Sequence, residues 1–253
     1  MKKVLLQGKD ICKSFSQGGQ SLPILNKVNV EVYGGDFTVI MGASGAGKST
    51  LLYSLSGMDR ITSGEIVYRG KKISSLIEKE MGQLRAKEFG FVFQQTHLVS
   101  NLTLLENIAV AGYVSGKRSP KEVQCRSLEL LSRMHADGAK NRLPSQASGG
   151  EAQRAAIARA MINDPGMIFA DEPTGALNKS NSEEVLSLLS SLNEGGQSIL
   201  MVTHDVRAAI RGNRILYLED GKVLDELVLP GYHAAAAKSR EASVTKWLSS
   251  LSW

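Results

Sequence analysis

The sequence predicts an α/β fold in which a mostly parallel sheet is flanked by helices and accompanied by an antiparallel β portion. Short apolar runs typical of buried strands, such as residues 37–41 and 199–203, alternate with segments of helical spacing. A glycine-rich loop follows the first of these runs, and Asp220-Gly221-Lys222 marks a closing hairpin late in the chain. This alternation of strands and helices is the pattern of a parallel α/β sheet.

The loop after residues 37–41 matches the phosphate-binding pattern G-x-x-x-x-G-K-[ST]. Its residues are Gly42, Ala43, Ser44, Gly45, Ala46, Gly47, Lys48 and Ser49. The glycines let backbone N–H groups point at phosphate oxygens, with the N-terminus of the following helix behind them. In this pattern Lys48 reaches the β- and γ-phosphates and Ser49 ligates Mg²⁺. Taken alone, the motif also fits a glycine-rich turn with an unrelated lysine.

Two acids follow the apolar run at residues 167–170. In phosphate-loop NTPases an Asp at the end of a neighbouring strand completes the Mg²⁺ site, and Asp171 fits this role. Glu172 is placed to orient and deprotonate an attacking water as a general base. Taken alone, the pattern also fits a strand that enters a solvated turn. Together with Lys48 it predicts a P-loop NTPase core that binds ATP and Mg²⁺.

A third motif, Ser148-Gly149-Gly150-Glu151, lies between these two. Ser148 can cap the helix that continues through residues 155–161, and the glycines allow close backbone approach. With this motif the chain resembles the ATP-binding subunits of ABC transporters, whose signature is commonly Leu-Ser-Gly-Gly-Gln/Glu, over about residues 3–228. Ala147 stands where the family usually has Leu, which predicts weaker packing of the loop and no loss of function.

The resemblance assigns roles to three more side chains. Phe15 would stack on adenine, with an ordinary core Phe as the alternative. Gln94 would contact Mg²⁺ and the attacking water, and the segment after it would face the membrane subunit. His204 would hydrogen-bond the γ-phosphate. The resemblance therefore implies catalytic roles for Lys48, Gln94, Glu172 and His204, metal ligation by Ser49, Gln94 and Asp171, and nucleotide contacts by Phe15, Gly42, Ala43, Ser44, Gly45, Ala46, Gly47, Lys48, Ser49, Thr50, Ser148, Gly149, Gly150, Glu151 and Asn178.

Asn178 departs from the pattern. It occupies the loop position where most members carry an Asp that crosses the dimer interface and supports the opposite catalytic site. Asn has the same shape, so it keeps a hydrogen bond but loses the negative charge. We expect slower hydrolysis or looser coupling between the two sites, with neither abolished.

The motifs divide the chain into an ATP-binding domain at residues 1–228, with a helical subdomain inserted at about 98–160, and a helical extension at 229–253. In the extension, Val244, Trp247, Leu248 and Leu251 form one apolar helical face that ends at Trp253. Docking of this helix on its own domain is the favoured interpretation, and contact with a partner or a membrane surface is the alternative.

Composition and charge argue against several classes of function. The net charge of +5 is mild, and the basic pairs Lys71-Lys72 and Lys117-Arg118 are expected on solvated loops. No basic stripe is interleaved with aromatic residues, so nucleic-acid binding is not expected. No apolar run reaches about 18 residues, which excludes a transmembrane span, and no signal peptide follows Met1. Cys12 and Cys125 lack metal or redox spacing and are expected to be reduced thiols in the cytosol.

Within this family, the chain more closely resembles the branch that includes lipoprotein-release and macrolide-efflux ATPases, and within it the ATPases of antimicrobial-peptide resistance. This resemblance implies a homodimer that closes head-to-tail on ATP and powers a separate integral membrane permease at the cytoplasmic face of a bacterial membrane. Export or membrane extraction of peptide, lipid-like or drug-like substrates is the favoured function. The alternatives are the ATPase of a sensing or signalling membrane complex and a soluble ABC ATPase without a transport role.

Overall fold

A computed structural model describes residues 2–17 and 20–251 of the chain. The chain divides into two compact units, which are described separately. Unit 1 consists of Met1–Ile77 with Asn193–Trp253, and unit 2 consists of Glu78–Leu192. The division predicted from the motifs, with domains at 1–228 and 229–253 and a helical subdomain at 98–160, stays a prediction.

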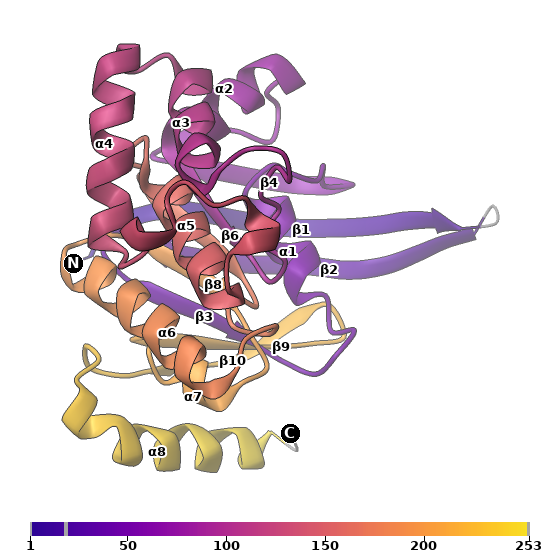
Figure 1. Ribbon diagram of the computed structural model, residues 1–253. Helices are drawn as coiled ribbons and strands as arrows, with labels where there is room; N and C mark the ends of the chain where they lie inside the picture. The colour runs from indigo at the N-terminus through magenta and orange to yellow at the C-terminus, as the bar shows by residue number, and fades with distance from the viewer. Residues whose placement is uncertain (1, 18–19, 252–253) are drawn as a thin grey trace. The chain divides into compact units, whose positions relative to one another are not determined.

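The first sheet of unit 1 is antiparallel, with the strand order β2-β1-β4-β5. Strands β1 (Val4–Gln17) and β2 (Gln20–Tyr33) form the long hairpin that Figure 1 shows in indigo. Strands β4 (Ser63–Tyr68) and β5 (Lys71–Lys72) follow. The prediction of a loop at Lys71-Lys72 was wrong, because the two lysines pair with Tyr68 and Val67 across a short hairpin.

The second sheet of unit 1 carries the glycine-rich loop. Strand β3 (Phe37–Met41) lies between β8 (Ile199–Val202) and β9 (Arg214–Glu219) and is parallel to both. Every residue of β3 is buried, as expected of a parallel strand covered on both faces. Strand β10 (Lys222–Val228) pairs antiparallel with β9, and helix α1 (Lys48–Leu55) packs against β8. Asp220-Gly221 form the predicted hairpin turn.

The last helix of unit 1 docks on its own unit. Helix α8 (Ala237–Ser250) follows a short 3-10 turn η3 (Ala234–Ala236) and packs against helix α7 (Val206–Ala209), as Figure 1 shows. Val244 and Leu248 are buried, and the indole N–H of Trp247 donates to an Asp225 carboxylate oxygen at 2.8 Å. The apolar face predicted at these positions is therefore covered by the chain itself. Trp253 lies outside the described residues.

Unit 2 is mostly helical around two parallel strands, β6 and β7. Helices α3, α4 and α5 pack against one another, and α5 also packs against β6. The helical spacing seen at residues 104–108 and 123–134 corresponds to α3 and α4. The elements are α2 (Glu78–Glu88), β6 (Phe89–Phe93), α3 (Leu104–Ser115), α4 (Pro120–Arg133), η1 (Asp137–Ala139), η2 (Pro144–Gln146), α5 (Gly149–Met161), β7 (Met167–Asp171) and α6 (Lys179–Glu194).

Unit 1 contains parallel and antiparallel strands and unit 2 contains two parallel strands, each with flanking helices, which is the predicted α/β class. Within residues 2–17 and 20–251, none of the helices combines the length and the apolar character that a membrane crossing needs.

Candidate functional site

The glycine-rich loop wraps around the side chain of Lys48. The Lys48 ammonium donates to the backbone oxygens of Gly42 and Ala43, at 2.9 Å each. Gly47 has a φ of 97° and caps helix α1, so the chain enters the helix through a conformation that favours glycine. At Gly42, a Cβ would lie 2.1 Å from the backbone oxygen of Leu218, so a larger residue cannot fit there.

The outer part of this loop is open to solvent. Ala43, Ser44 and Gly45 are exposed, and the first turn of α1 carries no acidic residue. The positive end of the α1 dipole is therefore preceded by an exposed loop and is not opposed by an acid in its own first turn, which favours an anion there. These features are those of a phosphate-binding loop.

His204 and Phe15 are the other predicted site residues of unit 1. His204 is exposed and lies two residues after β8, whose end is held beside β3 by the Thr203 N–H bond to the Ile40 oxygen at 3.1 Å. The ends of β3 and β8 therefore lie at the same edge of the sheet. Phe15 is 44% exposed and is not a core residue, and the Lys13 ammonium lies 4.6 Å from its ring centroid.

In unit 2 the parallel strands β6 and β7 bring Gln94, Asp171 and Glu172 to one edge. Phe93, which precedes Gln94, is the register partner of Asp171. The loop after Glu172 contacts Gln94, because a Cβ at Gly175 would lie 2.8 Å from the Gln94 amide nitrogen. Glu172 has a φ of 45°, an unfavourable conformation for a residue other than glycine, and its backbone oxygen accepts from the Gly175 N–H at 3.0 Å.

The signature motif forms the capped start of α5. The Ser148 hydroxyl accepts from the Glu151 N–H at 3.2 Å, and the Glu151 carboxylate accepts from the Ser148 N–H at 2.8 Å. The cap predicted at Ser148 is thus present as a reciprocal capping box. The bond from the Ser148 backbone holds the pKa of Glu151 below its usual value, so this carboxylate is ionised at neutral pH.

The small residues of the signature allow close contact with the segment around Asn178. A Cβ at Gly150 would lie 2.5 Å from the Asn181 side-chain oxygen, so a larger residue would require the Asn181 side chain to move. The Asn178 side-chain oxygen accepts from the Asn181 N–H at 2.9 Å and thereby caps helix α6. Asn178 therefore has a structural role that the sequence did not suggest.

Two polar side chains on α5, the buried Gln153 and the half-buried Arg159, were missed by the sequence analysis. The Gln153 amide nitrogen donates to the backbone oxygens of Phe93 and Pro173, and the Arg159 guanidinium donates to those of Thr96 and His97. Burial lowers the pKa of Arg159. Because all of these acceptors are backbone carbonyls, no residue pattern in the sequence identifies the pairs.

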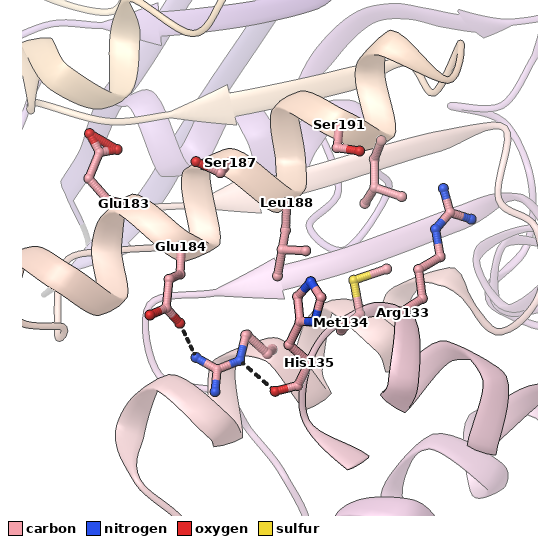
Figure 2. Close-up of a pocket in the computed structure, with 10 residues that line it drawn as sticks. Arg133, Met134, His135, Glu183, Glu184, Ser187, Leu188 and Ser191 are labelled. Carbon is pink, nitrogen blue, oxygen red and sulfur yellow. Dashed lines mark hydrogen bonds and ion pairs between the residues drawn. The ribbon is translucent and has the colours of Figure 1, made fainter. Parts of the chain in front are cut away.

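Unit 2 also contains a cavity of about 690 Å³ that none of the predicted site residues lines. It lies between the end of α4 and the outer face of α6, and Figure 2 shows Glu184 on α6 facing the loop that carries His135. The Arg154 guanidinium donates to the Glu184 carboxylate at 2.7 Å and to the His135 backbone oxygen at 3.3 Å. These contacts hold α5 to α6 and to the loop that carries His135.

The structure thus brings together the phosphate loop and the end of β8 in unit 1. In unit 2 it brings together Gln94, Asp171 and Glu172, and it places the signature glycines against the Asn178 segment. The oxygen donors of Ser49, Gln94 and Asp171 are a hydroxyl, an amide and a carboxylate, which suit the hard cation Mg²⁺.

Comparisons with known proteins agree on one family. The family model described as ABC transporter matches residues 25–175. The macrolide export ATP-binding/permease protein MacB of Pasteurella multocida (strain Pm70) is 38% identical over 251 residues, which cover 99% of this chain but only 38% of MacB.

Among solved structures, the dimeric ATP-binding cassette MJ0796 in a post-hydrolysis state with ADP and Pi is 39% identical. The match has a TM-score of 0.84 and covers 90% of this chain and all of that one. The structure of cbiO1 from Clostridium perfringens, part of the ABC transporter complex cbiONQ, is 25% identical with a TM-score of 0.78, over 89% of this chain and 88% of that one.

Proposed function

From the premise that this chain belongs to the ABC transporter family, as an ATPase cassette, we propose that it powers a membrane permease that exports a substrate or extracts it from the membrane. The observation that carries the proposal is the 38% identity to MacB, a macrolide export protein, along 99% of the chain. Peptide, lipid-like and drug-like molecules are the proposed substrate classes, and antimicrobial-peptide resistance is one proposed role. The proposed location is the cytoplasmic face of a bacterial membrane, at the permease.

The proposed chemistry assigns a role to each predicted side chain. Lys48 holds the β- and γ-phosphates, Phe15 stacks on adenine and His204 hydrogen-bonds the γ-phosphate. Glu172 accepts a proton from the attacking water, which Gln94 helps to orient. The remaining phosphate-loop residues, with Thr50, supply backbone and hydroxyl contacts to the nucleotide.

Mg²⁺ would be ligated by Ser49, Gln94 and Asp171, and it would neutralise the charge that develops on the transferred phosphoryl group. The donor types of these residues support this assignment.

We further propose that two copies close head-to-tail on ATP. Ser148, Gly149, Gly150 and Glu151 of one copy would contact the ATP held by Lys48 of the other. The dimeric cassette MJ0796, with which this chain shares 39% identity, supports the proposal. So does the exposure of Ser148 and Gly149 at the start of α5, which leaves them accessible to a second copy.

A pull-down tests the transport proposal. Tagged Glu172→Gln protein is captured from detergent-solubilised native membranes with Mg-ATP, and its partners are identified by mass spectrometry. We expect a multi-span permease that is enriched over a matched pull-down with Lys48→Ala, which lacks the phosphate-binding ammonium. A permease that proves to be a sensor without cargo would limit the proposal to signalling. Recovery of only ribosomal, DNA-bound or soluble partners would overturn it.

The substitution Asn178→Asp tests whether the uncharged residue slows this ATPase. Asp keeps the cap on α6, because its carboxylate accepts from the same Asn181 N–H. The added charge supplies a stronger acceptor, so we expect the turnover rate to rise about 2- to 10-fold or its cooperativity in ATP to increase. Steady-state ATPase assays over a range of ATP concentrations measure both.

The matched control is Ser180→Asp, which adds the same charge to the first turn of α6 without changing residue 178. We expect this control to alter stability by about 0.3–1 kcal/mol at most and to leave turnover unchanged. Equal turnover and cooperativity in Asn178→Asp and the unmodified protein would contradict the idea.

A further inference from the structure

A single buried amide connects the backbone at Gln94 with the backbone at Glu172. Gln153 lies on α5 and is 1% exposed. Its side-chain nitrogen donates to the backbone oxygen of Phe93 at 2.9 Å and to that of Pro173 at 2.8 Å. Because both neighbours are acceptors, the amide must present its two N–H groups to them, which determines the orientation of the side chain.

The two acceptors are adjacent in sequence to predicted catalytic residues. Phe93 directly precedes Gln94 and Pro173 directly follows Glu172. Glu172 has a left-handed backbone conformation, which persists only where the surrounding structure holds it. The bond from Gln153 to the next carbonyl is one of the contacts that hold this turn, together with the Gly175 N–H bond to the Glu172 oxygen.

The same helix holds the chain on the far side of Gln94. Arg159, six residues after Gln153 and so nearly two turns along the helix, donates to the Thr96 and His97 oxygens at 2.7 Å each. The segment with Gln94 is therefore bonded to α5 both before and after that residue. The N-terminus of α5 is the signature motif, so one rigid helix joins the signature to Gln94 and Glu172.

We infer that Gln153 is a positioning residue for ATP hydrolysis, which sets the places of Gln94 and Glu172 relative to the signature helix. The inference rests on the proposed role of Glu172 as the general base. Loss of the two N–H bonds releases the turn at Glu172 and the end of β6 while the phosphate loop, in the other unit, is unchanged. ATP binding should then be kept and the catalytic step slowed.

The test compares Gln153→Met and Gln153→Glu with the unmodified full chain. Met has a similar length and no polar hydrogen, and Glu has the same shape but presents oxygens to two carbonyls. For both we expect kcat for ATP to fall about 10- to 100-fold with KM for ATP changed by less than about threefold, since misplacement of a catalytic group by about 1 Å has effects of this size.

Arg154→Met is the matched control for loss of helix packing. Arg154 is the next residue of α5, is half-buried and also bonds a backbone carbonyl, but its contacts are His135 and Glu184. We expect it to lower the melting temperature and to leave kcat within about twofold of the unmodified value, because it touches neither strand end. Equal losses of kcat in Arg154→Met and the Gln153 variants would overturn the inference and reduce Gln153 to a packing role.

A double variant separates this inference from the proposed function. If Gln153 acts through Glu172, then Gln153→Met in the Glu172→Gln background should lower kcat by less than it does alone. Multiplicative losses would overturn the inference while leaving the base assignment in place. Normal turnover by Glu172→Gln alone would instead overturn the base assignment.

Discussion

In the variant Glu172→Gln we expect the rate of ATP hydrolysis to fall by about two to four orders of magnitude, with ATP binding retained. The amide has the shape of the carboxylate but cannot accept the proton of the attacking water. The residue follows β7, is partly exposed, and has its turn held by the Gly175 N–H bond, so the substitution leaves the backbone contacts in place. Because bound ATP is then not consumed, the closed dimer should accumulate.

Two measurements check this result. Phosphate release at saturating Mg-ATP gives kcat, and size-exclusion chromatography with and without ATP gives the dimer fraction. Glu183→Gln is a suitable control, because Glu183 is an exposed carboxylate of the same unit that lines the cavity beside α6. We expect the control to hydrolyse ATP at the normal rate. A Glu172→Gln protein that stays monomeric with ATP, or that turns over normally, would contradict the assignment of Glu172 as the base.

The second large effect is expected from Arg240→Met, which should lower the free energy of unfolding by about 3–5 kcal/mol. Arg240 is 5% exposed and donates to the backbone oxygens of Ile210, Gly212 and Pro230. Burial lowers the pKa of its guanidinium. Met fills a similar volume but leaves these three carbonyls without their donors, and each of the two buried ones, those of Ile210 and Gly212, costs about 1–3 kcal/mol when unmet.

Urea unfolding of the full chain measures this loss as a shift of the transition midpoint at constant slope. Lys238→Met is the matched control, because Lys238 lies on the same helix but is exposed. We expect the control to unfold within about 0.5 kcal/mol of the unmodified protein. A normal midpoint for Arg240→Met would show that α8 is not held by this contact. Deletion of residues 232–253 should destabilise at least as much, since Val244 and Leu248 are removed as well.

The local pattern of residues was sufficient to predict much of the fold. The run at residues 37–41 is apolar throughout because β3 is buried on both faces between two parallel strands. The signature helix begins at Ser148 because its hydroxyl and Glu151 satisfy N–H groups that lie within three residues. By contrast, Lys71 and Lys72 form a strand only because Val67 and Tyr68 lie opposite, and the local sequence resembles that of a solvated loop.

The sequence also predicted candidate catalytic residues. Lys48 was predicted from the glycine-rich loop pattern, Asp171 and Glu172 from their place after an apolar strand, and His204 from the family resemblance. The ends of β3 and β8 lie side by side in one unit, and those of β6 and β7 in the other. Asn178 was noticed only as a departure from the expected charge. Its role as the cap of α6 emerged with the hydrogen bond from Asn181.

The sequence by itself determined the α/β class, the family resemblance and the candidate catalytic residues, because these depend on periodicity and on side chains whose spacing is local. Only the tertiary structure decided that Gln153 joins the backbone at Gln94 and Glu172, and that Arg240 and Trp247 hold α8 to its own unit. The physical reason is that the acceptors of Gln153 and Arg240 are backbone carbonyls. Every residue has one, so the partner of a buried donor is known only when the chain is folded.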